Sequence, residues 1–345
     1  MMRTPKWWTR KNWQSTALLP ASWLYGLGQR LDKRCTRVRR APLPVIGIGN
    51  LTAGGAGKTP TAIALAQLLQ QLGETPHIVS RGYGGHRQHA RAVDPTRDTA
   101  SEVGDEALLL ARHAPTWVGA DRLASATAAH RAGATLVIAD DALQHYALHQ
   151  DQVIVVIDSA YGFGNGRLLP AGPLREPWRP ALLPRHHYLL LLGTDDPQGL
   201  MRVLPAPNGW MRASIEPSCE VEFLRRHHWL AFAGIARPEK FYATLRQHGA
   251  MLGDFADFAD HHPFSDADLQ ALDRRAEQQG LRLITTEKDA MRLPAAWRHR
   301  VATLPVALHW ADPDAARHFM QRIMQEAIKL HRGLDFPAAR DTLQP

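Results

Sequence analysis

A glycine-rich turn between two apolar segments determines the fold class that we expect. Residues 44–65 read PVIGIGNLTAGGAGKTPTAIAL. Residues 44–48 have a short apolar strand pattern, and residues 61–72 repeat apolar side chains at helical spacing. A glycine-rich turn between a strand and a helix is typical of a phosphate-binding loop, because the free N–H groups at the helix start point at the anion. The sequence therefore predicts an α/β protein that binds a nucleotide in this turn.

The turn departs from the strict pattern G-x-x-x-x-G-K-[ST], which requires a glycine where this chain has Thr52. Gly54 and Gly55 offset that loss and give the variant GGxGK[ST]. Lys58 is expected to reach the β- and γ-phosphates, and the hydroxyl of Thr59 to bind Mg²⁺. The residues predicted to hold the nucleotide are Thr52, Ala53, Gly54, Gly55, Ala56, Gly57, Lys58, Thr59 and Pro60.

Strand patterns alternate with helical patterns along the rest of the chain. Buried-type strands are expected at residues 77–80, 135–139, 153–157 and 188–192. This alternation predicts a parallel sheet flanked by helices, of the P-loop NTPase type, over residues 41–220. It begins again after residue 220, with strands at 229–233 and 281–285 and helices at 238–248 and 266–279. We expect a smaller C-terminal α/β domain at 221–330 and a loose tail at 331–345.

The N-terminal segment, residues 1–40, combines aromatic side chains with flanking positive charge. Residues 12–29 carry no formal charge, and a basic cluster follows them, made up of Lys33, Arg34, Arg37, Arg39 and Arg40. The run is too polar and too broken to span a bilayer, and no small-residue cleavage pattern indicates a secretory signal. We predict an interfacial membrane-anchor helix that inserts Leu18, Leu19, Trp23, Leu24 and Leu27. The alternative is an amphipathic helix packed on its own domain.

Composition limits the partners. The 345 residues carry a net charge of +8, with a pI near 9.8, which favours nucleic acid, an anionic membrane or a phosphorylated substrate. The two cysteines, Cys35 and Cys219, are far apart in the sequence. They exclude a disulfide framework and a cysteine-rich zinc site, and they fit a reducing compartment.

Two carboxylates follow one of the expected strands. Asp140 and Asp141 come directly after residues 135–139, where a metal ligand opposite the phosphate loop is expected. An N-cap role accounts for one of them but not comfortably for both. His145 and His149 follow at helical spacing and raise the alternative of zinc. Phosphate oxygens together with carboxylates favour Mg²⁺ instead.

A hydroxyl group that accepts a phosphoryl group requires a base to remove its proton, and two segments contain residues that could supply this base. Asp105 and Glu106 stand at the expected start of a helix, and His261 and His262 lie in the second α/β unit, after Asp260. A carboxylate and an imidazole that meet across a cleft form a base whose proton affinity each partner tunes. The alternatives are ordinary helix capping by Asp105 and a polar surface turn for the histidines.

Seven motifs occur together in one order along the chain. They are GNLTAGGAGKTP (49–60), SRGYGG (80–85), GDE (104–106), DDALQH (140–145), FGNGRLLPAGPLREP (163–177), DHHPF (260–264) and TTEKD (285–289). Over roughly residues 15–325 the chain closely resembles the tetraacyldisaccharide 4'-kinase family, the lipid A 4'-kinases of Gram-negative bacteria. The resemblance implies ATP-dependent phosphorylation of the 4'-hydroxyl of tetraacyldisaccharide 1-phosphate to form lipid IVA. It also implies two domains with the active site in the cleft between them, at the cytoplasmic face of the inner membrane.

The resemblance also assigns roles to residues. It implies that Lys58 and Thr59 hold the phosphates of ATP and the Mg²⁺, and that Asp140 and Asp141 are the metal-binding and active-site pair. Asp105 matches the proposed general base, which pairs with a histidine of the DHH motif, taken here as His261. Further site residues in matching motifs are Glu106, Arg175, Glu176 and His262. Glu176 is assigned to nucleotide binding.

One departure from the family pattern is visible: Ala142 and Leu143 follow the aspartates where the family usually has Gly-Phe. We expect these two side chains to pack and the chemistry to be unchanged. The expected partners are the lipid substrate and an anionic membrane surface, with peripheral or N-terminal anchoring. No nucleic acid and no obligate protein partner are expected.

Two other classes compete with a lipid kinase. A switch-type P-loop ATPase or GTPase that acts on a protein partner usually has a lysine where this chain has Ala53, or the guanine-reading pattern N-K-x-D. In Thr286-Glu287-Lys288-Asp289 the lysine comes one position too late for that pattern. A membrane- or nucleic-acid-binding module with a structural nucleotide leaves the carboxylate–histidine pair unexplained.

Overall fold

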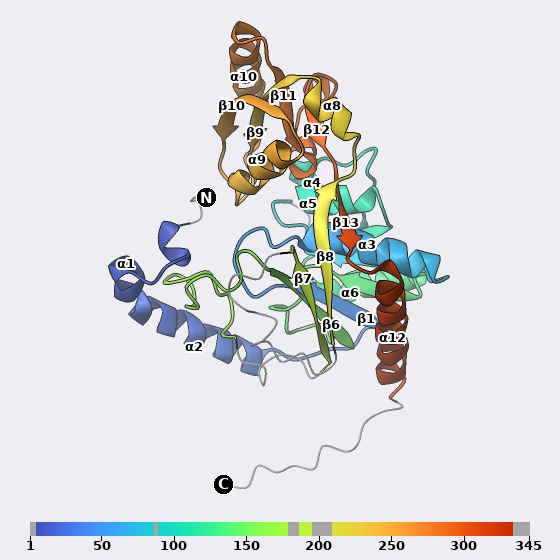
Figure 1. Ribbon diagram of the computed structural model, residues 1–345. Coiled ribbons are helices and arrows are strands. Elements are labelled where there is room, and N and C mark those ends of the chain that lie inside the picture. The colour runs from blue at the N-terminus through green and yellow to red at the C-terminus, as the bar shows by residue number, and fades with distance from the viewer. Residues whose placement is uncertain (1–4, 86–88, 179–185, 195–208, 334–345) are drawn as a thin grey trace.

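The strands form two separate sheets. The computed structural model describes residues 5–85, 89–178, 186–194 and 209–333, and within these ranges nine strands make one sheet and four make another. The smaller sheet lies above the larger one in Figure 1. The coarse prediction of a mixed α/β protein with a large, mainly parallel sheet is confirmed.

The large sheet is parallel except at its two edges. Its strand order is β13-β8-β7-β6-β1-β5-β2-β4-β3, with antiparallel pairing of β13 to β8 and of β3 to β4. Its strands are β1 (Val45–Gly49), β2 (Pro76–Ser80), β3 (Arg91–Ala92), β4 (Thr116–Val118), β5 (Leu136–Ala139), β6 (Gln152–Asp158), β7 (His187–Leu192), β8 (Trp210–Pro217) and β13 (Val306–Trp310). Every strand expected from an apolar run in this region is present, because helices cover both faces and bury those runs.

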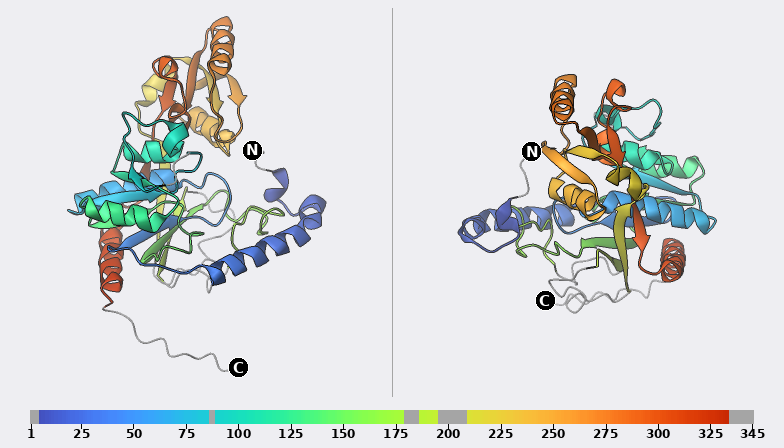
Figure 2. Two further views of the ribbon diagram at one scale, coloured as in Figure 1. Left: turned by 180° about the vertical axis from the view of Figure 1, so that it is seen from behind. Right: turned by 45° about the horizontal axis from the view of Figure 1, so that its top comes forward.

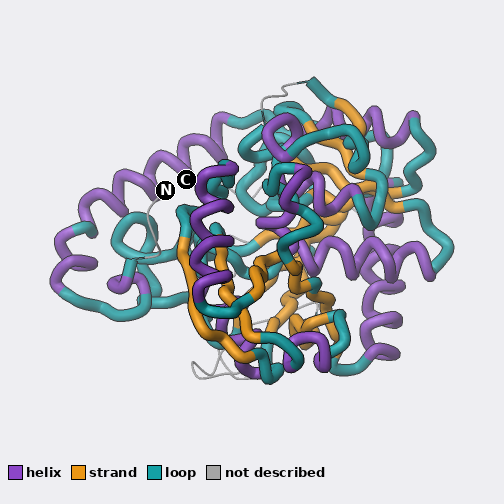
Figure 3. Tube along the Cα trace, turned by 90° about the horizontal axis from the view of Figure 1, so that it is seen from above, coloured by secondary structure: helices purple, strands orange, loops and turns teal. Residues whose placement is uncertain are grey.

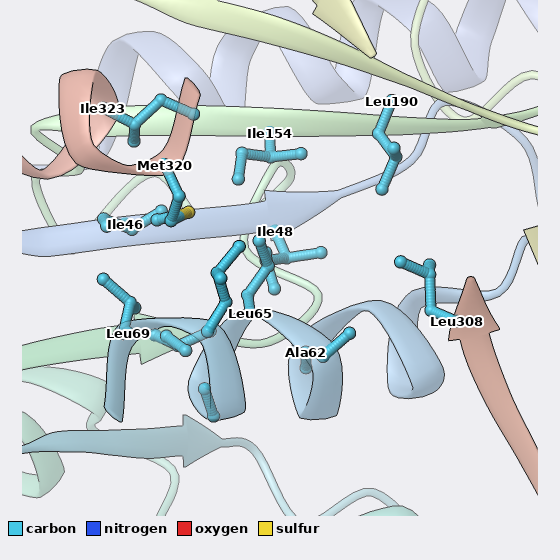
Figure 4. Packing of buried hydrophobic residues seen from close by; sticks show 14 of the residues in the cluster. Ile46, Ile48, Ala62, Leu65, Leu69, Ile154, Leu190, Leu308, Met320 and Ile323 are labelled. Atoms are coloured by element: carbon cyan, nitrogen blue, oxygen red, sulfur yellow. The ribbon is translucent and has the colours of Figure 1, made fainter. Parts of the chain in front are cut away.

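Helices cover both faces of the large sheet, as the view from above shows (Figure 3). They are α3 (Lys58–Gln71), α4 (Ala100–Val103), α5 (Asp105–Ala111), α6 (Arg122–Arg131) and α12 (Pro313–His331). On one face, Ile46 and Ile48 of β1 pack with Leu65 of α3 and with Met320 and Ile323 of α12 (Figure 4). Small side chains of α6 fill the other face against β2 and β5. The apolar periodicity of the sequence thus becomes a three-layer core.

The smaller unit contains a parallel sheet of order β10-β9-β11-β12 within the described residues. Its elements are α8 (Val221–Arg225), β9 (His228–Ala233), α9 (Pro238–Gln247), β10 (Met251–Asp257), α10 (Asp266–Gln278), β11 (Arg282–Thr286), α11 (Glu287–Ala290), η3 (Ala295–Trp297) and β12 (Ala302–Leu304). Both strands and both helices expected after residue 220 are present. The sequence analysis did not predict β10, whose residues are exposed or half-buried at the sheet edge.

The end of the chain returns to the large sheet. The sequence analysis assigned residues up to 330 to the smaller unit, whereas β13 pairs with β8 and α12 buries Ala316, Met320 and Ile323 in the large core. The physical reason is the open edge of β8, which β13 closes. The helix continues to His331, and residues 334–345 of the expected tail lie outside the described residues.

The N-terminal helices lie along the side of the large sheet, next to residues 163–174 (Figures 1 and 2). They are η1 (Lys6–Trp8), α1 (Trp13–Ala17) and α2 (Leu19–Cys35). The Ser22 hydroxyl donates to the carbonyl of Leu168 at 2.9 Å, and Arg167 donates to the Ser15 hydroxyl at 2.8 Å. Trp23 remains 70% exposed. Among the described residues, no helix has the length and apolar character needed to cross a membrane.

Candidate active site

A cleft of about 940 Å³ lies between the two sheets. Its large-sheet wall consists of the glycine-rich turn after β1, Asp140 and Asp141 after β5, and Ser159 after β6. The wall from the smaller unit contains the β9–α9 loop, His261 and the start of α11. Carboxyl ends of parallel strands therefore open onto the cleft, which is where α/β proteins bind their ligands.

The glycine-rich turn joins β1 to α3, and residues 53–60 line the cleft. Gly57 precedes the first residue of α3 with a φ of +86°, and a Cβ there would lie 2.5 Å from Cδ1 of Leu192. This position therefore requires glycine both for conformation and for space. Thr52 does not line the cleft; it is buried in an isolated antiparallel bridge with Leu174, where a side chain is tolerated.

Asp141 is held among cations beside the turn. Its Oδ1 lies 2.8 Å from Nη1 of Arg175 and 3.4 Å from Nζ of Lys58. The carbonyl of Asp141 accepts a hydrogen bond from Arg122, at 3.1 Å. Burial alone would raise the pKa of this carboxyl, but the charges of Lys58 and Arg175 outweigh it and hold the pKa well below its usual range. Lys58 also donates to Oδ1 of Asn50 at 2.9 Å.

The adjacent Asp140 has the opposite electrostatic environment. It is 1% exposed, and its Oδ1 has no hydrogen-bond partner among the described residues. Burial, with the neighbouring Glu106 and Asp141 carboxylates, raises the pKa of Asp140 to about 7. A buried, unpartnered carboxylate oxygen next to a second carboxylate, in a cleft that Thr59 also lines, gives a donor set suited to a hard divalent cation.

Asp105 and His261 come from different units and meet at the cleft. Oδ2 of Asp105 lies 2.9 Å from Nδ1 of His261 and 3.2 Å from Nε of Arg292. Burial would raise the pKa of Asp105, but the hydrogen bond from His261 and the charge of Lys288 outweigh burial and lower it. Asp105 is 3% exposed and lies behind His261, which lines the cleft.

The turn that presents His261 is conformationally unusual. His261 has a φ of +59°, and its backbone N–H donates to the carbonyl of Gly234 at 3.0 Å. On the opposite side, Gly104 has a φ of +89° directly before Asp105, and a Cβ there would lie 2.6 Å from the carbonyl oxygen of Tyr83. Both partners therefore depend on positive-φ backbone just before or at the functional residue.

A further charged residue at this place was not identified from the sequence. Nζ of Lys288, in α11, lies 3.0 Å from Oε1 of Glu106 and 3.2 Å from Nε2 of His261. The sequence analysis considered Lys288 only as part of a failed guanine-reading pattern. Its position in TTEKD was a signal, but its partners are 27 and 182 residues away in the chain, so spacing could not reveal them.

A second set of ion pairs connects the smaller unit to the glycine-rich turn. Asp158, at the end of β6, accepts hydrogen bonds from Arg237 at 2.8 Å and from Lys240 at 2.6 Å. Arg237 also donates to the carbonyl of Gly55. The position of the smaller unit is thereby linked to the tip of the turn.

Some predicted site residues do not line the cleft. His262 contacts Asp268 at 3.1 Å and packs on Phe258 and Phe264. Glu176 is buried, and burial raises its pKa; the side chains that hydrogen-bond to it are Gln144 and Tyr146. The side chains of His262 and Glu176 therefore pack around the cleft and do not form its wall.

The alternative of zinc receives no support from the described residues. His149 lies 3.5 Å from Asp151, whereas His145 lines the cleft, and burial lowers the pKa of His145 to about 4. The described residues contain no group of three or more His, Cys, Asp or Glu side chains that could hold a metal ion by themselves. Ala142 and Leu143 are buried, as expected for packing residues.

Comparison with known proteins agrees with this geometry. The sequence model of a family described as tetraacyldisaccharide-1-P 4'-kinase matches residues 14–325. A tetraacyldisaccharide 4'-kinase from Paramagnetospirillum magneticum is 45% identical over 323 residues, which cover 93% of this chain and 99% of the relative. One from Methylobacterium nodulans is 46% identical, with 91% and 94% covered.

A solved structure is also similar. It is described as the "apo" form of LpxK from Aquifex aeolicus in complex with ATP. It aligns with a TM-score of 0.71 and 26% identity, over 90% of this chain and 99% of that chain. None of these relatives is a switch-type ATPase or GTPase, so that alternative has no support here.

Proposed function

This chain belongs to the tetraacyldisaccharide-1-phosphate 4'-kinase family, and we propose which of its residues carry out phosphoryl transfer. It catalyses the ATP-dependent 4'-phosphorylation step in the biosynthesis of lipid A. ATP lies with its phosphates on residues 53–60, and the sugar acceptor approaches from the side of His261. The observation that carries this proposal is the 2.9 Å contact between Asp105 and His261, at the same cleft as the glycine-rich turn.

The glycine-rich turn holds the phosphates through its backbone N–H groups and Lys58. Residues 53–60 line the cleft, and Lys58 lies beside Asp141 and Asn50, where its charge is available to the β- and γ-phosphates. Arg175 neutralises Asp141 from the other side. These cations lie where negative charge develops during transfer.

Thr59, Asp140 and Asp141 would hold Mg²⁺ together with phosphate oxygens. The unpartnered Oδ1 of Asp140 and its raised pKa fit a missing positive charge. Magnesium commonly uses one or two carboxylates plus substrate phosphates, which agrees with the small number of protein ligands here. When bound, the ion would supply positive charge that neutralises the phosphate oxygens.

Asp105 and His261 act as one unit that removes the proton of the acceptor. The 4'-hydroxyl oxygen forms a bond to the γ-phosphorus, the bond from that phosphorus to the β,γ-bridging oxygen breaks, and ADP leaves with the electron pair. The hydroxyl proton passes to the pair. Because His261 lines the cleft and Asp105 lies behind it, the imidazole is nearer to the acceptor and Asp105 stabilises its protonated form. This changes the roles expected from the sequence, in which Asp105 itself was the base.

The enzyme works as a peripheral protein at the cytoplasmic face of the inner membrane. Trp13, Trp23, Leu24 and Leu27 of the N-terminal helices are exposed, and the basic cluster follows them. An apolar face next to positive charge suits the surface of an anionic bilayer. A lipid acceptor that stays in the bilayer requires the enzyme to come to it.

The test is transfer of the γ-phosphate of labelled ATP to tetraacyldisaccharide 1-phosphate by native protein, D105N and H261Q. Each variant is expected to lose ~10²–10⁴-fold in kcat, the usual contribution of a positioned acid–base group. H262Q is the matched control: it changes the neighbouring histidine, which faces Asp268, and should transfer phosphate at close to the native rate. Near-native transfer by H261Q and D105N would contradict the proposed pair.

A further inference from the structure

Lys288 makes contacts on both walls of the cleft. It begins in the smaller unit, on α11, and its Nζ lies 3.0 Å from Oε1 of Glu106, on α5 of the large-sheet side. The same Nζ lies 3.2 Å from Nε2 of His261. The Lys288 side chain is 21% exposed and lines the cleft.

The two ring nitrogens of His261 have partners of opposite chemical type. An ammonium group can only donate hydrogen bonds, so Nε2 must accept from Lys288. An ionised carboxylate can only accept, so Nδ1 must donate to Asp105. Together these contacts determine the tautomer of a neutral imidazole, with hydrogen on Nδ1 and the lone pair on Nε2.

We propose that Lys288 is a positioning residue for phosphoryl transfer, which holds His261 in one tautomer and one orientation, with the lone pair on Nε2, until the acceptor hydroxyl replaces the ammonium there. Glu106 holds the ammonium in place from the opposite wall. This inference rests on the proposed role of Asp105 and His261 as the proton acceptor. It adds a third member to that pair, from the segment TTEKD.

The charges around His261 support this role. Asp105 faces Nδ1, Lys288 faces Nε2, Asp260 of the same turn lies 3.8 Å from Nε2, and the Tyr83 ring lies 5.3 Å from the imidazole, centroid to centroid. Arg292 contacts Asp105, and Glu106 contacts Lys288. Burial would lower the pKa of Lys288, but Glu106 and Asp105 outweigh burial and raise it, so the ammonium stays charged.

A cation at Nε2 has a catalytic consequence. It repels a second positive charge on the neighbouring ring, because like charges this close together repel each other. When the acceptor hydroxyl approaches Nε2, the ammonium can remain bound to Glu106 alone. Loss of Lys288 should therefore change both the ring orientation and the pH at which the base form is lost.

The experiment uses the full-length protein with two readouts. Nitrogen NMR of ¹⁵N-histidine-labelled protein reports the tautomer of His261 without catalysis, with assignment from H261Q. The pH profile of kcat/KM reports the loss of the base form. The variants are K288M, K288R and the control R300M, which removes an ion pair with Asp273 on the exposed surface of the same unit.

Native protein should show hydrogen on Nδ1 and an unprotonated Nε2. K288M should give a mixture of tautomers, move the acid limb of the profile upward by about one pH unit, and lower kcat/KM at neutral pH by ~10- to 100-fold. K288R should restore most of the activity and the native limb, and R300M should match native protein. If K288M does not fold, K288M/E106Q replaces it, because that variant leaves no unpaired Glu106 carboxylate.

An unchanged tautomer and an unchanged acid limb in the folded Lys288 variant would overturn the inference. So would a native protein with hydrogen on Nε2. Because the NMR readout needs no turnover, it remains decisive even if H261Q proves active and the proposed proton acceptor is wrong.

Discussion

At the scale of single residues, backbone conformation decides which departures from the phosphate-loop pattern the chain tolerates. Thr52 occupies a position with an isolated bridge partner, Leu174, and does not need the conformational freedom of glycine. Gly57 has a positive φ, and a Cβ added there would lie 2.5 Å from Cδ1 of Leu192 and 2.7 Å from Cδ1 of Ile215. The chain therefore departs from the strict pattern at residue 52, where a side chain fits, and keeps its glycine at residue 57, where a side chain does not fit.

The substitution G57A should destabilise the protein and weaken ATP binding. A left-handed alanine costs about 1–2 kcal/mol, and the contacts with Leu192 and Ile215 add to that and displace the turn. Urea unfolding and calorimetric titration with ATP measure the two effects. The control is G73A, which has a φ of +88° but open space around its Cβ. It should show only the conformational cost, and ATP binding by G57A equal to that of G73A would contradict the argument.

At the scale of elements, α2 serves two environments with two faces. The Ser22 hydroxyl donates a hydrogen bond to the carbonyl of Leu168 and accepts one from the backbone N–H of Ala171. Trp23 and Leu24, by contrast, are 70% and 71% exposed. One face of the helix thus packs on the protein, and insertion of the exposed face into a membrane stays a prediction.

The triple variant W23Q/L24Q/L27Q should bind anionic vesicles more weakly than native protein. Each large apolar side chain contributes up to about 1.5–3 kcal/mol when fully buried, whereas exposed positions affect the free energy of unfolding by about 0.5 kcal/mol or less. Vesicle sedimentation and urea unfolding measure the two quantities. M251Q/F255Q is the control, because it removes exposed apolar side chains from the smaller unit. Equal sedimentation of the two variants would refute a membrane role for α2.

At the scale of the whole molecule, charged side chains of the smaller unit complete the site. Lys288 and Arg292 reach the residues of α5, and Arg237 and Lys240 reach Asp158. The large sheet alone supplies the glycine-rich turn and the paired aspartates. The proton-accepting pair exists only where the two units meet.

The ion pairs at Asp158 should make the free energy of unfolding depend on pH in the acidic range. Burial would raise the pKa of Asp158, but the charges of Lys240 and Arg237 outweigh burial and hold the pKa below its ordinary value. A lowered folded-state pKa gives a stabilisation that is complete above the unfolded value and is lost as the pH falls through the folded value. Native protein should therefore lose free energy of unfolding below pH ~4 more steeply than D158N.

At neutral pH, D158N should be less stable by about 1–3 kcal/mol, because Arg237 loses its charged partner. Urea unfolding from pH 3 to 7 measures both effects. D273N, which removes an exposed pair with Arg300, should follow the native curve. If the free energy of unfolding of native protein and of D158N changed in parallel with pH, the expected titration of Asp158 would be contradicted.

The sequence by itself determined the apolar interior strands that it predicted and the local motifs. Apolar runs that are buried on both faces, such as residues 153–157, can only be interior strands, and the turn before Lys58 has a composition that few other structures require. Interior strands β4 and β8 and edge strands such as β10 and β13 escaped prediction. The edge strands β10 and β13 carry mixed polar and apolar residues because one side of each lies near solvent. The hydrophobic pattern of a short segment reflects how deeply its side chains are buried, and burial is least at the edges of a sheet.

Only the tertiary structure decided which distant residues meet. It brought Lys288 to Glu106, placed Asp105 behind His261, and moved His262 and Glu176 out of the cleft wall. It also returned α12 to the large sheet. Side-chain partners separated by more than a hundred residues depend on how two sheets pack, and no local spacing encodes that. The sequence thus determined the chemical groups, and the packing of the two units determined their arrangement.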